Sequence, residues 1–264
     1  MILFGILAIL LILTALFSEQ LCPYDPYLQN LANAKAAPSA DHIFGTDRYG
    51  RDMLSRVIMG GQTTIFSSLF LVLIVMTVGT IIGIICGYKG GKLDTFLMRI
   101  SDIFLAFPGM VFAIAVAGVT GGGVINAVVA LACISWPKFA RIARSQVMTV
   151  KETPFISAAR LSGSGTWKII RKHMLPNIAG PILITGVLDI GTMIMEIAGL
   201  SFLGLGAVPP VAEWGSMMSN GRSMLQTSPW VILAPGFAIF VTVMLFNLLG
   251  DSIRDIMDPR RNKR

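Results

Sequence analysis

Two acidic residues, Asp189 and Glu196, interrupt an otherwise apolar run and are the best candidates for chemistry inside a membrane. They stand seven residues apart, which places both on about the same face of a helix, and Met193 shares part of that face. Ionisable groups at such depth cost free energy and usually face a bundle interior or an aqueous path. The spacing therefore predicts a translocation path that attracts positively charged cargo, with hydrogen bonding between helices as the alternative role.

The other polar residues give no catalytic arrangement. The predicted topology places the two histidines, His42 and His173, on opposite sides of the membrane, so they cannot share a metal site. The three cysteines are far apart and form neither a disulfide framework nor a metal-ligand spacing. No glycine-rich loop is followed by Lys and Ser or Thr, so the chain has no P-loop for ATP. We predict no catalytic residue, no enzyme activity and no cofactor bound by this chain, and the sequence identifies no metal ligands.

Composition predicts that the acids lie in an all-α polytopic membrane protein. Hydrophobic residues make up 54% of the 264 residues and charged residues 13%, with a mean hydropathy of +0.74. Apolar stretches near the ~20 residues that cross a bilayer recur along the chain, and helices satisfy their own backbone hydrogen bonds in lipid. Six spans are predicted, namely Ile2–Phe17, Thr64–Tyr88, Ile103–Val119, Val124–Trp136, Ile178–Leu200 and Pro229–Leu249.

These spans divide the chain and orient it. The predicted parts are a first span (1–17), an extracytoplasmic segment (18–63), a core of five spans (64–250) and a tail (251–264). Basic residues concentrate in segments 89–99, 138–172 and 254–264, so the positive-inside rule predicts that both termini are cytoplasmic. The net charge of +7 fits this topology and does not indicate nucleic-acid binding.

The basic stretch Phe155–Asn177, which lies between two spans, is predicted to form two short helices joined by a bend. Small residues at 157–159 open a helical turn, and Gly163 and Gly165 allow a bend that a Cβ would resist. A second helical run follows, with an apolar stripe of Trp167, Ile170 and Met174. Pro176 is expected to end that run, because proline lacks an amide hydrogen. The alternative is an amphipathic helix on the membrane surface with its basic residues toward anionic lipid.

The stretch resembles the cytoplasmic coupling region of ABC-importer permeases, which have Glu-Ala-Ala, three residues, Gly, and later Leu-Pro. Ser157 stands where that family usually has Glu. The resemblance implies an ATPase-coupling region within 138–177, carried by Ser157, Ala158, Ala159, Arg160, Gly163, Leu175 and Pro176.

Three further motifs resemble the peptide/nickel branch of these permeases. They are Gly45–Arg56, Gly199–Gly206 and Gly250–Arg260. Without the resemblance, the first of them predicts a solvated amphipathic helix with paired charges, capped by Thr46.

The resemblance implies an ABC type I importer permease fold with about six transmembrane helices and a coupling helix in the cell membrane. Its expected partners are a second homologous permease subunit, two cytoplasmic ATPase subunits that use ATP, an extracytoplasmic binding protein and the lipid bilayer. The run Leu188–Gly191 looks like the nickel-transporting branch, which implies nickel, another transition metal or a metal chelate as cargo. Di- or oligopeptides are the alternative cargo. An ion-coupled secondary carrier is a third reading, but the chain lacks its internal repeat.

Three local features complete the predictions. Phe107–Gly109 is expected to bend or restart a helix, and Pro137 to end the fourth span. The segment Ala212–Gly215, with Met217 and Met218, predicts an interfacial tryptophan beside packed methionines, or alternatively a mouth for cargo.

Overall fold

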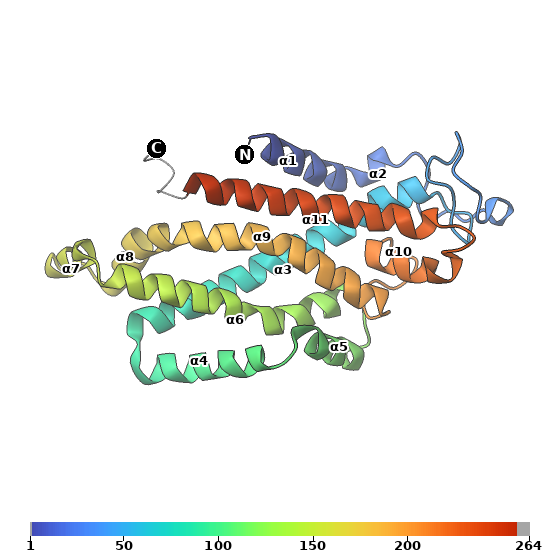
Figure 1. The fold of residues 1–264 in the computed structure, drawn as a ribbon. Coiled ribbons are helices and arrows are strands. Elements are labelled where there is room, and N and C mark those ends of the chain that lie inside the picture. Colours follow the sequence, from blue (N-terminus) through green and yellow to red (C-terminus); the bar gives the residue numbers. More distant parts are fainter. Residues whose placement is uncertain (1, 258–264) are drawn as a thin grey trace.

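A computed structural model describes residues 2–257 of the chain. Within that range the regular structure is helical, apart from one isolated antiparallel bridge between Thr46 and Asp52. Figure 1 shows long helices running alongside one another, with α7 and α8 at one end of the bundle and α10 at the other. The helices of four turns or more are α1 (Ile2–Leu16), α3 (Met53–Lys89), α4 (Gly91–Ala106), α6 (Val124–Lys151), α9 (Leu175–Phe202) and α11 (Trp230–Met257). The shorter ones are α2 (Ser18–Leu21), η1 (Leu31–Asn33), α5 (Gly109–Val119), α7 (Pro154–Leu161), α8 (Thr166–Ile169), η2 (Ile170–Met174), α10 (Trp214–Gly221) and η3 (Arg222–Met224).

Four helices of the described range are long and apolar enough to cross a membrane: α3, α6, the continuous helix Thr166–Phe202 and α11. The bent pair α4 and α5 is a fifth candidate if it counts as one span. Helix α1 has 15 apolar-rich residues and is therefore about 22 Å long, shorter than the ~30 Å hydrocarbon core. The predicted all-α polytopic architecture is confirmed, and the six predicted spans correspond to these four helices, the bent pair and α1.

The third predicted span, Ile103–Val119, is not one straight helix. Its two halves, α4 and α5, meet at an angle of 88°. Phe107 has extended backbone angles (φ −91°, ψ 142°) because the following Pro108 excludes the helical region for the residue before it. The bend predicted at Phe107–Gly109 is confirmed.

Helix α6 corrects the predicted end of the fourth span. We expected Pro137 to stop the helix after Trp136, but α6 continues without a break to Lys151, with Pro137 inside it. Neighbouring helices and local adjustments commonly re-satisfy the backbone groups that proline frees in membrane helices. Lys138 therefore lies on a spanning helix, and not in a loop.

Helix α3 begins before the predicted border at residue 63, at Met53. With 37 residues it is longer than one membrane crossing requires, so the border itself stays a prediction. Asp52 caps the helix, because its carboxylate accepts the Ser55 amide at 2.7 Å. Thr46 was expected to cap this helix and does not: its hydroxyl donates to the Asn33 carbonyl and accepts from the Ala36 amide.

Helices α3 and α6 cross at very close range through a stripe of small residues on α3. A Cβ built on Gly83 would lie 2.4 Å from the Ala140 carbonyl oxygen and 2.6 Å from the Ala143 Cβ. Gly79 and Gly87, one turn to each side, meet α6 equally closely. Such small-residue stripes let membrane helices gain van der Waals contact between their backbones.

We therefore expect Gly83→Leu to push α3 and α6 apart. Overpacking of this kind costs about 1–3 kcal/mol of unfolding free energy, and here the wall is backbone and cannot rotate away. Thermal unfolding of the purified protein in detergent measures the loss. Gly118→Leu is the matched control, because nothing lies within 4 Å of its ideal Cβ. Equal midpoints for the two variants would contradict this account of the contact.

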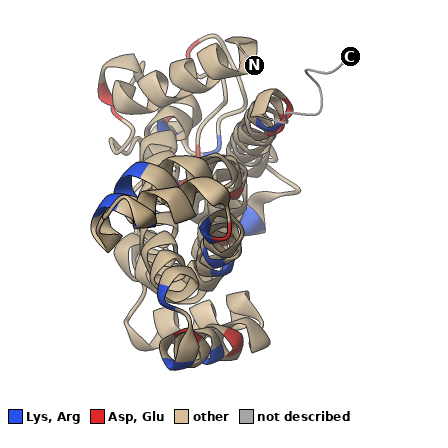
Figure 2. Cartoon of the chain, turned by 90° about the vertical axis from the view of Figure 1, so that its left-hand side faces the viewer, with Lys and Arg blue, Asp and Glu red and all other residues tan. Residues whose placement is uncertain are grey.

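Basic side chains gather at the end of the bundle that carries α7. Figure 2 looks onto that end and shows several Lys and Arg residues on its helices. The carboxyl-terminal motif reaches Arg260 and the predicted tail reaches residue 264, so residues 258–264 of both lie outside the described range. The inward orientation of this end stays a prediction.

Candidate coupling and translocation site

Helix α7 projects beyond the ends of the long helices (Figure 1). Thr153 precedes it and Pro154 occupies its first turn, where a missing amide hydrogen costs nothing. Ile156 and Ala159 are its buried residues, so they attach it to the rest of the chain. The predicted coupling residues Ser157, Ala158 and Arg160 are exposed. They form an exposed face of two small residues and one arginine at the tip of the molecule.

A glycine elbow ends α7. The Ser164 amide donates to the Ala159 carbonyl, and the Gly163 amide donates to the Arg160 carbonyl, both at 3.0 Å. This pair of bonds is the Schellman arrangement, which requires a left-handed residue after the helix. Gly163 has φ +78° and fills that position without a Cβ penalty. Gly165 has φ −67° and ψ 158°, an extended conformation open to any residue, and begins α8.

Pro176 does not stop the second helix, which corrects the sequence prediction. Helices α8, η2 and α9 run on as one helix from Thr166 to Phe202. The turn Ile170–Met174 is a π-helix, in which the Leu175 amide reaches back five residues to the Ile170 carbonyl. Pro176 then falls in the first turn of α9 and is exposed, as is Leu175. A π-turn thus directly precedes the proline, and local π geometry is one of the adjustments that let membrane helices tolerate proline.

The π-turn also changes which side chains are buried. The predicted stripe was Trp167, Ile170 and Met174, but the buried residues are Ile169 and Met174. Trp167 is 72% exposed. The π-turn departs from the regular 3.6-residue helical period. An apolar stripe predicted from that period therefore does not match the buried residues here.

Tyr88, near the end of α3, contacts Arg160 of α7 and Lys151 at the end of α6. Its ring lies beneath the Arg160 guanidinium, 5.8 Å from centroid to Cζ. Its carbonyl accepts from Lys151 Nζ at 2.9 Å. These two contacts connect α7 and the end of α6 to the end of α3.

Within the membrane-spanning part, Asp189 forms an ion pair with Lys138 of α6. Asp189 is 1% exposed, whereas the Lys138 side chain is about half exposed. The second carboxylate oxygen of Asp189, Oδ2, is buried without a hydrogen-bond partner among residues 2–257. A half-exposed lysine side chain on a spanning helix is costly in lipid. This side of α6 is therefore expected to face protein or water.

Glu196 and Met193 do not join the Asp189 pair. Glu196 stands seven residues along α9, about 10 Å of helix rise away, and its Oε2 atom is buried without a partner in the described range. Met193 is 3% exposed and packs in the core. The translocation roles of these three residues stay predictions.

Sequence reasoning missed Lys138. The predicted topology places it in a cytoplasmic segment, because the fourth span is predicted to end at Pro137. Because buried charges are normally paired, two features of the sequence together indicate this ion pair. One is an acidic residue inside an apolar run, and the other is a basic residue just beyond the end of a different apolar run.

Two more ion pairs hold α4 against α6. Arg144 forms two hydrogen bonds of 2.6 Å to the Asp94 carboxylate, and Arg141 pairs with Asp102. Ser101 is the only buried residue of α4. Because Asp94 is the more buried of the two acids, the Arg144–Asp94 pair is the stronger of these two links between α4 and α6.

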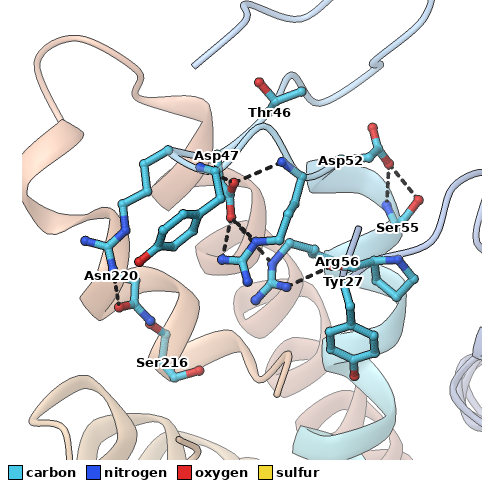
Figure 3. A network of polar contacts seen from close by, with 12 residues as sticks. Tyr27, Thr46, Asp47, Asp52, Ser55, Arg56, Ser216 and Asn220 are labelled. Carbon is cyan, nitrogen blue, oxygen red and sulfur yellow. Dashed lines mark hydrogen bonds and ion pairs between the residues drawn. The ribbon is translucent and has the colours of Figure 1, made fainter. Parts of the chain in front are cut away.

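At the opposite end of the bundle, the motif Gly45–Arg56 folds into a buried polar network (Figure 3). Asp47 accepts from Arg51 Nε at 2.7 Å and from the Tyr49 amide at 2.8 Å. Arg56 lies 3.9 Å from the same carboxylate and donates to the Pro26 carbonyl at 2.9 Å. The solvated helix considered for this motif is therefore wrong, because four of its five charged residues are buried and have polar partners, and only Arg48 is exposed.

The segment around Trp214 belongs to the same end. Trp214 is 4% exposed and donates its indole N–H to the Val57 carbonyl at 2.8 Å. Glu213 is fully buried and caps α10 by accepting the Gly215 and Ser216 amides at 2.9 and 2.8 Å. Burial raises the pKa of the Glu213 carboxyl, and these amide bonds oppose the rise. Neither an interfacial tryptophan nor a cargo mouth fits this geometry, which instead fastens α10 to α3.

The chain as a whole was then compared with known proteins. Residues 79–263 match the family described as "Binding-protein-dependent transport system inner membrane component", which covers more than half of the chain. The chain belongs to this family. It is an inner-membrane permease of an ABC importer, a transport subunit and not an enzyme, and ATP is hydrolysed by separate subunits.

Curated relatives of this permease cover almost all of it. It is 41% identical over 249 residues to the dipeptide transport system permease protein DppC of Alkalihalophilus pseudofirmus, covering 94% of this chain and 82% of that protein. It is 42% identical over 258 residues to the glutathione transport system permease protein GsiD of Pectobacterium atrosepticum, covering 97% and 85%. It is 39% identical over 254 residues to the nickel transport system permease protein NikC of Escherichia coli K12, covering 96% and 92%.

The fold of the permease also matches a solved structure. Superposition on a chain of the MetNI methionine ABC transporter in an inward-facing conformation gives a TM-score of 0.63 at 18% identity. It covers 78% of this chain and 98% of that one. The expected ABC importer permease fold is therefore confirmed, and the family implies ATPase and binding-protein partners.

Proposed function

We propose that this permease and a second homologous permease subunit together enclose the translocation path of an ATP-driven importer. One of two cytoplasmic ATPase subunits docks on the exposed face of α7, the other docks on the second permease, and an extracytoplasmic binding protein delivers cargo at the end that carries α10. ATP-driven closure of the ATPases moves α7, and the contacts at Tyr88 pass that motion to α3 and α6. The path then opens alternately to each side. ATP is bound by the partner subunits, and both termini of this chain face the cytoplasm of the cell.

The cargo we propose is a transition metal such as nickel, carried as a chelate. The single observation behind the choice of a chelate is the ion pair of Asp189 with Lys138. A carboxylate whose counter-charge already comes from the protein attracts a free cation weakly, while a chelate with its ligands satisfied needs no strong protein ligand. The resemblance of Leu188–Gly191 to the nickel branch supports the metal.

A short peptide is the second candidate cargo. It is supported by relatives named as dipeptide and glutathione permeases. A dipeptide and a metal chelate are similar in size, both carry several carboxylate or amide oxygens, and both have a small net charge. The same translocation path can therefore accommodate either cargo.

Uptake by cells that lack the gene separates these cargoes. We would compare radioactive nickel alone, the same nickel with an added aminocarboxylate chelator, and a labelled dipeptide, with and without the gene restored. Our proposal predicts that restoring the gene restores uptake of chelated nickel most strongly. Restored dipeptide uptake with unchanged nickel uptake would overturn the metal proposal and make the chain a peptide permease.

A further inference from the structure

An apolar groove of about 660 Å³ runs between α3 and the continuous helix Thr166–Phe202. Its walls include Ile81 and Ile85 on one side and Leu175 and Leu183 on the other. Along α3 the groove extends from Met76 to Ile85, about 14 Å at 1.5 Å per residue. That length matches the hydrocarbon depth of one bilayer leaflet, about 15 Å.

The mouth of this groove is basic and aromatic. Trp167 and Arg171 line it, and both are exposed. Lys168 and Lys172 are exposed in the same two turns. Arg171 takes part in none of the ion pairs formed within residues 2–257. A guanidinium with no ion-pair partner in that range, beside a tryptophan at the end of an apolar groove, matches the charge of a lipid phosphate at the membrane interface.

Two other apolar grooves lack these features. The groove between α9 and α11, about 820 Å³, has Asn247 as its only amide side chain and no charged residue. The groove between α3 and α6, about 550 Å³, also has no charged lining residue. The basic mouth therefore singles out the groove beside Trp167.

We propose that the groove beside Trp167 binds one anionic phospholipid. One acyl chain lies between α3 and α9, and the phosphate sits at Arg171, with Lys168 and Lys172 adding positive charge. The lipid then fills the space beside the π-turn Ile170–Met174, where the coupling segment joins α9. This inference concerns lipid recognition, and it does not depend on which cargo the importer carries.

Fluorescence quenching by brominated lipids tests the proposal. The full-length chain is placed in nanodiscs of phosphatidylcholine that contain either dibrominated phosphatidylglycerol or dibrominated phosphatidylcholine at equal fractions. The Trp167 signal is the difference between the parent chain and Trp167→Phe. We expect stronger Trp167 quenching by the anionic lipid, with an apparent affinity that falls about fivefold in Arg171→Gln, the factor for one basic residue near a membrane surface.

Two further variants separate a site from a general surface effect. Lys92→Gln removes an exposed basic residue that does not line the groove and should leave quenching unchanged. Ala179→Phe fills the groove, keeps the basic mouth, and should lower retention of phosphatidylglycerol in native mass spectrometry. Equal Trp167 quenching by both lipids, quenching by neither, or no effect of Arg171→Gln would each overturn the proposal.

Discussion

Replacing Lys138 by methionine is expected to lower the unfolding free energy by about 3 kcal/mol, because it strands the buried Asp189 carboxylate without a counter-charge. Asp189→Asn should cost much less, about 1 kcal/mol, since the half-exposed Lys138 ammonium can remain hydrated. The two substitutions thus differ in their cost in unfolding free energy because Asp189 is buried and Lys138 is half exposed. Thermal unfolding in detergent should show a midpoint ~6–12 °C lower for Lys138→Met.

The double variant Lys138→Met with Asp189→Leu is the stringent control for this effect. It removes both charges, so it should recover most of the stability lost in Lys138→Met alone. Lys92→Met, at an exposed residue with no ion pair in the described range, should stay within about 0.5 kcal/mol of the parent. If Asp189→Asn were as costly as Lys138→Met, the lysine would not be the group that offsets the buried charge.

The second large effect is expected at the elbow after α7. Gly163→Pro forces φ from +78° to about −65° and removes the amide that donates to the Arg160 carbonyl. The variant should remain inserted, because Gly163 is exposed and nothing lies within 4 Å of its ideal Cβ. We expect ATP-driven uptake to fall by roughly 5- to 150-fold, the range of coupling free energies between linked sites. Uptake is measured in cells, and insertion by the amount of chain in the membrane fraction.

Gly163 and Gly165 provide a matched pair for this test. Neither has an atom within 4 Å of an ideal Cβ, so alanine adds no clash at either position. Gly163→Ala must adopt a left-handed conformation, which costs about 1–2 kcal/mol, whereas Gly165→Ala keeps φ −67° without strain. Normal uptake by Gly163→Pro, or equal losses for the two alanine variants, would show that the elbow does not couple ATP hydrolysis to transport.

Much of the coupling segment could be predicted from sequence because its determinants are local. Small residues followed by glycines specify a short helix with a left-handed end, and the structure has both α7 and the Gly163 elbow. The behaviour of Pro176 is not local. Whether a proline ends a helix depends on the surrounding backbone geometry, and here a π-turn directly precedes Pro176 and the helix continues.

The contacts of Asp189 show where sequence reasoning stops. Its depth in an apolar run was visible, but its partner lies 51 residues away on α6. The same is true of Trp214, whose indole reaches the Val57 carbonyl across 157 residues. No periodicity within one helix predicts which helix lies opposite, because tertiary packing decides it.

The buried network at Asp47 was also outside what local patterns could show. Alternating charges with an internal spacing of four residues normally indicate a solvated helix face. In the structure Arg51 and Arg56 converge on one carboxylate under a covering chain that includes Pro26. The arrangement depends on how segment 22–52 folds back over α3.

The central claim is that α7 receives the ATPase, and photo-crosslinking from α7 tests it most directly. A photoreactive residue at the exposed position Ser157 is compared in living cells with one at Leu31, which is 70% exposed in η1 near the opposite end. We predict that Ser157 captures a P-loop ATPase subunit, identified by mass spectrometry, and that Leu31 does not. Capture of the ATPase from Leu31, or from neither position, would contradict the coupling role of α7 and the orientation on which it depends.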